Sequence, residues 1–415
     1  MKFKKLLEFI FSRRHFIYFH FPSETLKFIP FSEIFLSLFT ADEEDAEHFK
    51  SAIKGLYPRL QEVMLFNSGR MAMYTYLRAL DLEKGSKVVV PPFTCDVVIN
   101  ALLYLDLMPV YCDISAENFG YDIGELRKTV SEHRPRVIIA QHSFGIPCAI
   151  EEIMDIAEKN GIAVIEDCAH GFGVPYKGKR LGEFGHAAFF STDQTKSFST
   201  LLGGVLILNK MEEVDRVRQV YNAELVPFPR TQVLNIFLQQ LYFKVFNHDR
   251  VYVISQFLQS MFYRWGLFFD LKEDGVTFKK PKSYPMGMSH LQAHWGHLQL
   301  QSLERNFSER MTSVVDIENV LGIKKFRGLP LLRYPLLVPD RQNYRFESKY
   351  FEIGNWFDCV ALNRVGSDKE IYYRAGTCPV AERIHGQIIN IPLLPSDREL
   401  YRRLLPELFS ILNIK

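Results

Sequence analysis

The chain has 415 residues, which is long for one hydrophobic core and predicts two domains. Apolar residues make up 47% of it, so we expect a folded protein with a substantial core and not a disordered chain. Fifty basic against 48 acidic residues give a formal charge of +2, which argues against a general attraction to nucleic acid.

The N-terminal stretch MKFKKLLEFIFSRRHFIYFHFP begins like a signal peptide, with basic residues followed by apolar ones. Glu8 and the pair Arg13-Arg14 interrupt the apolar run, and no cleavage site of small residues follows, so we reject secretion. No segment reaches the ~20 uninterrupted apolar residues that a spanning helix needs. The sequence therefore predicts no transmembrane segment.

Between residues 63 and 210, short β-branched runs alternate with longer helical patterns. This order is typical of a mostly parallel sheet covered by helices on both faces, and the near-continuous apolar runs fit strands buried on both sides. The expected strands are Lys87–Val90, Pro109–Cys112, Val137–Gln141, Ala163–Glu166, Ala187–Ser191 and Val205–Leu208. The expected helices are Arg70–Leu80, Val97–Leu105, Ile123–Ser131 and Ile150–Asn160.

An aromatic-rich insertion spans about residues 222–283, and within 231–270 apolar positions recur at helical spacing. The favoured interpretation is a helical hairpin packed on the body of the protein or on a partner subunit, because buried helices commonly show this pattern. The alternative is a membrane-surface element, to which the aromatic first forty residues would contribute.

Residues 289–312 predict one long helix that leads into a C-terminal region. There, RYPLLVPD, CVALNRV and GQIINIPLL resemble strands, and ELYRRLLPELFSIL predicts a closing helix, so we expect a small α+β domain. The proposed division is an N-terminal arm with helices over 1–62, a large domain over 63–288, and a linking helix with the small domain over 289–415.

The cysteines form no CxxC pair, and the histidines of the long helix have no acidic companions in sequence. We therefore expect reduced thiols, a cytoplasmic location and no metal site. The cysteines are Cys95, Cys112, Cys148, Cys168, Cys359 and Cys378, and the histidines are His290, His294 and His297.

Three short segments carry candidate chemistry. In FNSGRMAMYTYL a strand end is followed by Ser68 and Gly69 and then by a helix, an arrangement that can cradle a phosphate. In VIEDCAHGFG, Asp167 ends a buried strand, where ligands of open α/β sheets bind. The ordinary alternatives are a serine N-cap and a capping aspartate.

The third segment, FFSTDQTKSFSTLLGG, places Ser191 at a strand end and Lys196 five residues later. A lone lysine is most often a solvated charge, but its amine can condense with an aldehyde such as that of pyridoxal phosphate. This cofactor needs a phosphate cradle, a carboxylate for the pyridine nitrogen and a lysine for the aldehyde. Together the three segments predict a pyridoxal 5'-phosphate site.

These stretches resemble the DegT/StrS-type aminotransferases, which act on keto sugars attached to nucleotides. The resemblance is close over residues 60–210, returns at MSHLQAHWGHLQLQSLERNFSER, and is fainter at INIPLLPSDRELYRRLLPEL. It implies the type I aminotransferase fold, with a seven-stranded, mostly parallel sheet and a smaller C-terminal domain, and a homodimer with sites at the interface.

The resemblance also implies roles for single residues. Lys196 falls at the position of the lysine that binds the cofactor aldehyde, Asp167 at that of the partner of the pyridine nitrogen, and Ser191 at that of a phosphate ligand. Gly69 and Arg70 fall in the phosphate-cradling loop, and His170 falls where a glutamine often contacts the ring hydroxyl. Cys95 replaces an aromatic ring that often stacks on the cofactor.

Other positions depart further from the family pattern. Leu202 replaces a glutamate that is usual before the glycine pair, and Arg70 replaces a small hydroxyl residue. Pro285 and Gly287 stand where the family commonly offers Asn and Arg to the neighbouring subunit's site. We expect these changes to affect the substrate and phosphate contacts more than the presence of the cofactor. His142 and Tyr284 are candidate substrate contacts, the latter across the dimer, and the alternative is a structural role, which is the commoner one for a lone histidine at a strand end.

The expected reaction moves an amino group from an amino acid, glutamate being the favoured donor, to a keto sugar. Two alternatives stay open. One keeps the cofactor but runs a dehydration or uses a non-sugar acceptor, although Lys196 favours transamination. The other is a non-catalytic homologue that binds a partner or a membrane surface, for which Cys95 and the aromatic insertion are the support.

Overall fold

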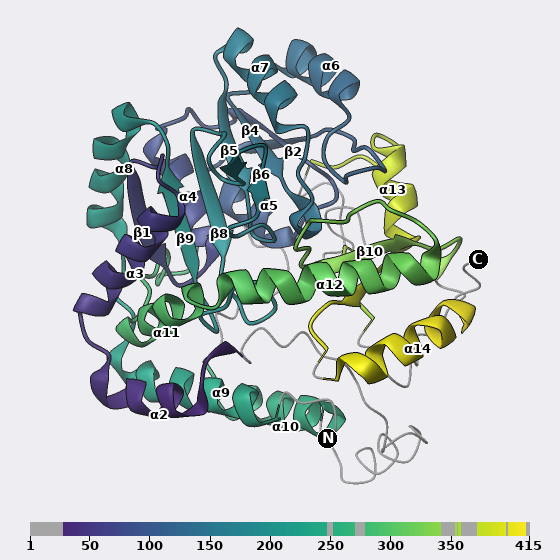
Figure 1. Ribbon diagram of the computed structural model, residues 1–415. Coiled ribbons are helices and arrows are strands. Elements are labelled where there is room, and N and C mark those ends of the chain that lie inside the picture. The colour runs from purple at the N-terminus through teal and green to yellow at the C-terminus, as the bar shows by residue number, and fades with distance from the viewer. Residues whose placement is uncertain are drawn as a thin grey trace.

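A seven-stranded sheet forms the centre of the computed structural model, which describes residues 28–246, 252–269, 279–341, 353–354, 356–357, 372–395 and 397–411 (Figure 1). The strand order is β1-β9-β8-β5-β4-β2-β3, parallel from β8 to β3, with β9 antiparallel to both of its neighbours. Its strands are β1 Glu62–Phe66, β2 Lys87–Val90, β3 Met108–Tyr111, β4 Val137–Gln141, β5 Ala163–Asp167, β8 Ala187–Ser191 and β9 Gly204–Leu208. This confirms the expected fold class.

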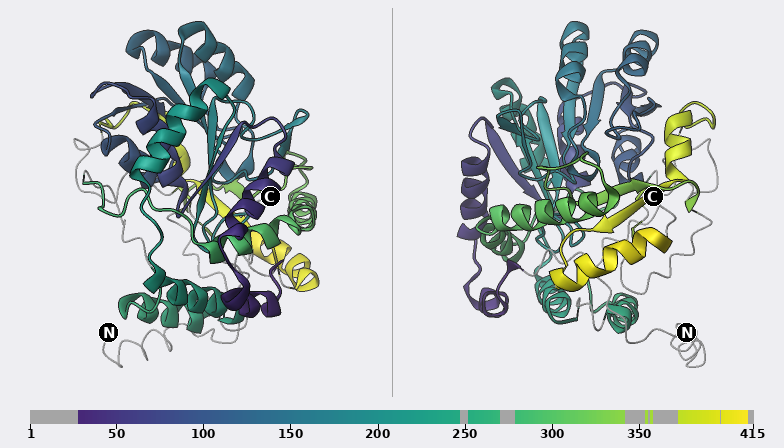
Figure 2. Two further views of the ribbon diagram at one scale, coloured as in Figure 1. Left: turned by 90° about the vertical axis from the view of Figure 1, so that its left-hand side faces the viewer. Right: turned by 45° about the vertical axis from the view of Figure 1, so that its right-hand side comes forward.

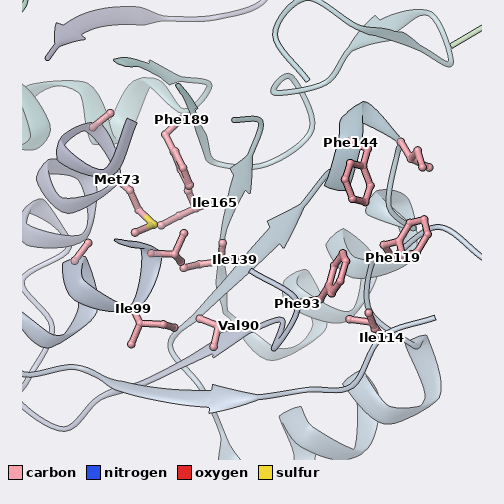
Figure 3. Close-up of a cluster of buried hydrophobic side chains, with 14 of the residues drawn as sticks. Met73, Val90, Phe93, Ile99, Ile114, Phe119, Ile139, Phe144, Ile165 and Phe189 are labelled. Carbon is pink, nitrogen blue, oxygen red and sulfur yellow. The ribbon is translucent and has the colours of Figure 1, made fainter. Parts of the chain in front are cut away.

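Helices cover both faces of the sheet because successive side chains of each strand point to opposite sides. On one face the strands pack against α4 Gly69–Ala79, α5 Asp96–Leu103 and α8 Met211–Glu224. Figure 3 shows Met73 and Ile99 of these helices meeting Ile139 and Ile165 of the strands. On the other face α6 Ile123–His133 and α7 Ile150–Asn160 cover the parallel half, and α3 Glu44–Leu56 and α12 Leu303–Leu321 cover the antiparallel half.

The C-terminal region is built on a two-stranded antiparallel sheet, β10 Arg333–Leu337 with β11 Ile388–Pro392. Helix α13 Pro379–His385 precedes β11, and α14 Arg398–Ile411 follows it and packs on α12. Both strands and the closing helix were expected. The predicted strand CVALNRV lies outside the described residues. The division of the chain at residues 62 and 288 stays a prediction.

The long helix expected over residues 289–312 is wrong, because two helices take its place. Helix α11, His290–Leu300, ends before Ser302, whose backbone (φ −104°, ψ 5°) is not helical, and α12 begins at Leu303. The Gln299 side chain hydrogen-bonds the backbone N–H and C=O of Ser199, which ties the end of α11 to the loop after β8. A sequence pattern does not reveal such a tertiary contact.

The aromatic insertion forms the expected helical hairpin, α9 Val233–Phe246 and α10 Tyr252–Arg264. It lies beside α2 Phe31–Thr40 at the bottom of the molecule, as both views of Figure 2 also show. Gln239 donates to the Tyr263 hydroxyl at 2.8 Å, and Tyr242 donates to the backbone oxygen of Ser255 at 2.5 Å, so polar contacts join the two helices. Among the helices that the structure describes, none is long and apolar enough to cross a membrane.

Smaller differences concern the ends of elements. Strand β3 begins one residue earlier than expected, and α5 runs over Asp96–Leu103 in place of 97–105. A short antiparallel pair, β6 Pro175–Tyr176 with β7 Lys179–Arg180, was not expected. The five described cysteines are free thiols, as expected: Cys95, Cys112, Cys148, Cys168 and Cys378.

Candidate active site

The carboxyl ends of β5 and β8 meet the N-terminus of α4 at one edge of the sheet. Asp167 ends β5 and Ser191 ends β8, and the loop from residue 192 to 203 returns the chain to β9, where Gly204 pairs with Ser191. Lys196 stands in this loop, so the topology brings together the three segments that the sequence analysis singled out.

The Lys196 loop is held by its own polar side chains. Asp193 accepts hydrogen bonds from the Thr195 N–H (2.9 Å) and the Thr195 hydroxyl (2.8 Å), and its backbone oxygen accepts the Lys196 N–H at 2.9 Å. The hydroxyls of Thr192 and Thr200 lie 2.6 Å apart and close the base of the loop. The position of the lysine is therefore set by the hydroxyl-bearing residues around it.

Backbones approach very closely where β9 passes the start of α4. A Cβ atom on Gly204 would lie 2.2 Å from the carbonyl carbon of Ser68 and 2.4 Å from the nitrogen of Gly69. A Cβ atom on Gly69 would lie 3.0 Å from the Phe190 oxygen. Only glycine fits at position 204, and this close approach places β9 directly against the first turn of α4.

Ser68 is the N-cap of α4, but its side chain makes no capping hydrogen bond. Its hydroxyl oxygen is buried and has no hydrogen-bond partner among the described residues. A buried polar group normally has a partner, and the first N–H groups of a helix favour an anion. The hydroxyl and the helix start thus fit a phosphate. Arg70, in the first turn of α4, is half-buried beside them.

Asp167 is buried, and its Oδ1 accepts a hydrogen bond from the Ala169 N–H at 3.0 Å. Burial raises the pKa of this carboxyl group to about 6, although the Ala169 N–H and the positive charges of Lys196 and His142 act in the opposite direction. A buried carboxylate with this pKa is well suited to a cationic ring nitrogen, which would stabilise its ionised form.

His170 is buried, with Nδ1 accepting the Phe144 N–H at 3.0 Å. Burial, followed by the positive charges of Lys196 and Arg333, holds the pKa of its ring well below the usual range. The imidazole is therefore neutral, and its proton is on Nε2, which can donate to an oxygen of a bound ligand. Phe144 also belongs to the aromatic group with Phe93 and Phe119 that Figure 3 shows.

Aromatic residues of the C-terminal region complete the site, and the sequence analysis missed them. Trp356 stacks on His170 with ring centroids 5.5 Å apart, and Phe357 lies parallel to the same ring at 6.0 Å. The Nζ atom of Lys196 lies 5.0 Å from the centre of the Trp356 ring. Trp356 therefore covers the lysine from the side of the small sheet.

Asn390 and Arg333, on the two strands of the small sheet, hold Trp356 in place. The Trp356 N–H donates to Asn390 Oδ1 at 3.2 Å, and Asn390 Nδ2 donates to the Trp356 oxygen at 2.9 Å. The guanidinium carbon of Arg333 lies 5.1 Å from the centre of the Trp356 ring, on a cation–π contact. No local motif signals these contacts, since residues 333, 356 and 390 meet only through the fold.

His142 does not have the accessibility expected of a substrate contact. Its side chain is fully buried, its Nδ1 accepts the Cys148 N–H at 3.2 Å, and its Nε2 lies 3.0 Å from Glu166 Oε2. With both nitrogens engaged inside the chain, the geometry gives the ring a structural role. The physical reason is that Glu166 and the Cys148 N–H already engage both ring nitrogens.

Glu166, next to Asp167, serves the scaffold. Its two oxygens accept hydrogen bonds from the N–H groups of Gly182 (2.9 Å), Phe184 (2.7 Å) and Gly185 (2.7 Å), in addition to the His142 contact. Ligand atoms of His142, Glu166 and Cys168 lie within 4.8 Å of one another, a spacing that a metal could use. The Glu166 oxygens already accept hydrogen bonds from backbone N–H groups. We therefore interpret the cluster as a set of hydrogen bonds that holds the loop before β8 in place.

The structure places the two other predicted contacts as follows. Cys95 is the N-cap of α5 and is exposed, with Sγ 3.3 Å from Asp96 Oδ1. Tyr284 is buried and packs edge-on against Tyr74 (5.1 Å) and Tyr104 (5.3 Å), on the α4–α5 side of the sheet. Its expected role across a dimer stays a prediction.

Comparisons with known proteins find similarity to aminotransferases. The family model described as the DegT/DnrJ/EryC1/StrS aminotransferase family matches residues 38–238. The chain is similar to GDP-perosamine synthase of Escherichia coli O157:H7, with 31% identity over 157 residues, which cover 38% of this chain and 43% of that protein. The matched part thus spans less than half the length of this curated relative.

Solved structures show the same fold over nearly the whole chain. Helicobacter pylori PseC, an aminotransferase involved in the biosynthesis of pseudoaminic acid, aligns with a TM-score of 0.71 and 14% identity, covering 96% of this chain and 99% of that one. Bacillus subtilis NtdA, solved with bound cofactor PMP, aligns with a TM-score of 0.71 and 18% identity, covering 95% and 85%.

Proposed function

Because this chain belongs, through residues 38–238, to the DegT/DnrJ/EryC1/StrS aminotransferase family, we propose that it is a pyridoxal phosphate-dependent sugar aminotransferase. It moves the amino group of an amino acid, glutamate, to a keto sugar carried on a nucleotide. The names of similar proteins support the acceptor class, among them GDP-perosamine synthase and a UDP-sugar aminotransferase of Acidithiobacillus ferrooxidans. The observation that carries the proposal is the meeting of Lys196, Asp167 and the start of α4 at one sheet edge.

The residues present fit the cofactor. Its phosphate fits at the N-terminus of α4, where the buried Ser68 hydroxyl has no partner among the described residues and Gly204 approaches the backbone of Ser68 and Gly69. In our proposal Ser68, Gly69, Arg70 and Ser191 hold the phosphate, Asp167 faces the ring nitrogen, His170 the ring hydroxyl and Lys196 the aldehyde, with Cys95 at the ring. When bound, the cofactor supplies an aldehyde and a ring that accepts the electrons of the broken C–H bond.

The side chains of this chain then move protons and exclude water. The Lys196 amine removes the proton from the substrate carbon that carries the amino group and later delivers a proton to the acceptor carbon. Asp167, as the carboxylate, keeps a proton on the nitrogen that it faces. The Nε2–H of His170 holds an oxygen in the ring plane, and Trp356 shields the Lys196 amine from solvent.

A buried pair of arginines supports an anionic amino donor. Arg310 is fully buried, and burial and the neighbouring charge of Arg333 lower its pKa to about 9. Arg333 reaches the Trp356 ring, and its charge also acts on His170. Arg333 contacts the same Trp356 ring as Lys196, and the positive potential of Arg333 and its neighbour Arg310 favours a substrate with carboxylates, such as glutamate.

A screen of nucleotide-linked keto sugars with glutamate tests the function. We expect one of them to lose its keto form while 2-oxoglutarate accumulates in equal amount. A protein that binds the cofactor but forms 2-oxoglutarate with none of the sugars would instead favour dehydration or a non-sugar acceptor. A protein that cannot be reconstituted with pyridoxal phosphate would favour a non-catalytic homologue.

Further parts of the proposal concern the assembly and the pathway. The protein works as a homodimer in the cytoplasm, and its product enters cell-surface polysaccharide or secondary-metabolite biosynthesis. Spore coat polysaccharide biosynthesis protein SpsC of Bacillus subtilis is among the similar proteins and supports the first pathway class. The segment with Pro285 and Gly287 lies against β1 of its own chain, through Phe66 and Gly287, so a partner contact there would differ from the family pattern.

Cofactor affinity should depend on pH through Asp167. The pKa of about 6 belongs to the free protein, and a ring-nitrogen cation binds the ionised carboxylate better than the acid. We therefore expect full affinity above pH 6 and a decline of up to about tenfold for each pH unit below it. Titration of the cofactor-free protein with pyridoxal phosphate at several pH values measures this, and Asp167→Asn should bind weakly without a step near pH 6. An unchanged step in that variant would contradict the assignment.

A further inference from the structure

The second half of the loop that carries Lys196 is buried, with residues 197–201 each at most 1% exposed. Strand pairing fixes the two ends of the loop, because Ser191 pairs with Gly204 across β8 and β9. Lys196 lies between these ends, so strand pairing alone does not set its position. Buried backbone N–H and C=O groups need hydrogen-bond partners, and in this loop some of them find their partners on other elements.

Three buried amide side chains of helices α11 and α12, which follow one another across the molecule in Figure 1, supply these partners. We call them the amide clamp, and its members are Gln292, Gln299 and Asn306. The Gln299 amide accepts the N–H of Ser199 at 3.2 Å and donates to the oxygen of the same residue, as a neighbouring strand would. Asn306 donates to the oxygen of Ser197 at 2.8 Å, one residue after the lysine.

Gln292 joins the loop to the proposed phosphate cradle at the start of α4. Its Nε2 donates to the oxygen of Leu202 and, at 2.9 Å, to Oδ1 of Asn67, the residue before Ser68. Its Oε1 accepts hydrogen bonds from the N–H (3.0 Å) and the hydroxyl (2.8 Å) of Ser289. Both donors and both lone pairs of the amide are engaged, so its orientation is fixed.

The other end of the clamp reaches the small sheet through Arg310. Oδ1 of Asn306 accepts a hydrogen bond from Arg310 Nε at 2.7 Å. Nη1 of Arg310 donates to the backbone oxygens of Leu331 (3.2 Å) and Leu332 (2.6 Å), which lead into β10. The amide clamp therefore ties the Lys196 loop to the cradle on one side and to the small sheet on the other.

From these contacts we propose that the amide clamp holds the Lys196 amine at a fixed distance from the phosphate cradle. Its members act through the backbone of the loop and are positioning residues. Pyridoxal phosphate would be held at two points, at its aldehyde by Lys196 and at its phosphate by the start of α4. The second point adds its full contribution only where the scaffold keeps the two points at the matching spacing. The inference rests on the proposed roles of Lys196 and Ser68, and not on the proposed sugar acceptor.

Gln239 of α9 distinguishes this role from a contribution to stability alone. It is fully buried like Gln292, donates to the Tyr263 hydroxyl at 2.8 Å and accepts the N–H of Phe269 at 3.2 Å. These bonds join α9 to α10 and to the segment after it, and none of them involves the Lys196 loop. Loss of the Gln239 amide should therefore lower stability without altering the spacing between the lysine and the cradle.

Binding of pyridoxal and of pyridoxal phosphate to the full-length protein, freed of cofactor, tests the proposal. The ratio of the two dissociation constants measures what the phosphate adds to attachment at Lys196. Gln292→Met has a similar volume but lacks the amide, and it should reduce this ratio at least about tenfold while the affinity for pyridoxal changes less than about twofold. Gln299→Met should also reduce the ratio. The matched control Gln239→Met should keep the ratio of the unaltered protein.

Two results would overturn the proposal. One is an equal ratio in Gln292→Met and the unaltered protein, which would show that the clamp does not set the spacing. The other is an equal fall of the ratio in Gln239→Met, because the loss of any buried amide would then act through stability. Circular dichroism verifies the folding of each variant, and Gln299→Met gives the decisive ratio if Gln292→Met does not fold. The experiment contains no amino donor and no sugar, so its outcome is separate from that of the proposed transamination.

Discussion

Replacing Lys196 with alanine is expected to reduce turnover by at least about four orders of magnitude, while the protein stays folded. The amine both binds the cofactor aldehyde and moves the proton of the substrate carbon in the proposed reaction, so no other group can take over both tasks. The surrounding loop is held by Asp193, Thr195, Thr192 and Thr200, none of which depends on the lysine side chain. The visible absorbance of the bound cofactor should also change, and steady-state kinetics with glutamate measures the loss.

Two controls separate this chemical role from a structural one. A small amine added to Lys196→Ala should restore part of the rate by carrying the proton, which a merely misfolded site would not permit. Lys128→Ala, on the exposed face of α6, removes a lysine of equal charge far from the site and should leave turnover unchanged. A Lys196→Ala protein with ordinary turnover would rule out the assigned role.

A single added methyl group at Gly204 should have the second largest effect. The Cβ atom of Gly204→Ala would lie 2.2 Å from the Ser68 carbonyl carbon and 2.3 Å from its oxygen. These are backbone atoms, and β9 is held between β1 and β8, so neither side can move without breaking strand pairing. We expect the free energy of unfolding to fall by about 3 kcal/mol or more. Cofactor affinity should fall with it, because the displaced start of α4 is the proposed phosphate cradle.

Gly55→Ala is the matched control for this substitution. Gly55 lies in α3, and a Cβ atom there would have nothing within 4 Å. Alanine has the better helix propensity, so the control should be neutral or gain up to about 1 kcal/mol. Urea denaturation of both variants gives the free energies, and titration with pyridoxal phosphate gives the affinities. Equal stability of Gly204→Ala and the unaltered protein would show that the two backbones do not approach as described.

The central sheet was predictable because its strands are buried on both faces. Lys87–Val90, Val137–Gln141 and Ala187–Ser191 agree residue for residue with the structure, as does the helix Ile150–Asn160. In each of these segments, the apolar pattern and the length together are compatible with only one type of secondary structure. The break at Ser302 was not predictable from the pattern of residues 289–312, and the contact that accompanies it, between Gln299 and the distant Ser199, forms only in the folded chain.

The same division holds for the site. Ser68, Asp167 and Lys196 could be proposed from the sequence because each stands beside a strand end in a segment with its own local signal, and the fold brings their three segments together. Trp356, Arg333 and Asn390 were missed because they reach the site only when the small sheet closes over it. For His142 the sequence left a substrate contact and a structural role open, since a position at a strand end does not show where the side chain points, and its contacts with Glu166 and the Cys148 N–H favour the structural role.

Glu166 and Asp167 are neighbours in β5, yet one anchors a loop through three backbone N–H groups and the other faces the Lys196 side of the sheet. Because strand side chains alternate, a deletion just before Glu166 would move Asp167 into the place of Glu166, and an insertion there would move Glu166 into the place of Asp167. After the deletion the shorter aspartate would replace glutamate beneath the loop, and after the insertion glutamate would enter the proposed ligand space. A change in the length of this strand would therefore displace both the loop anchor and the proposed partner of the ring nitrogen in one step.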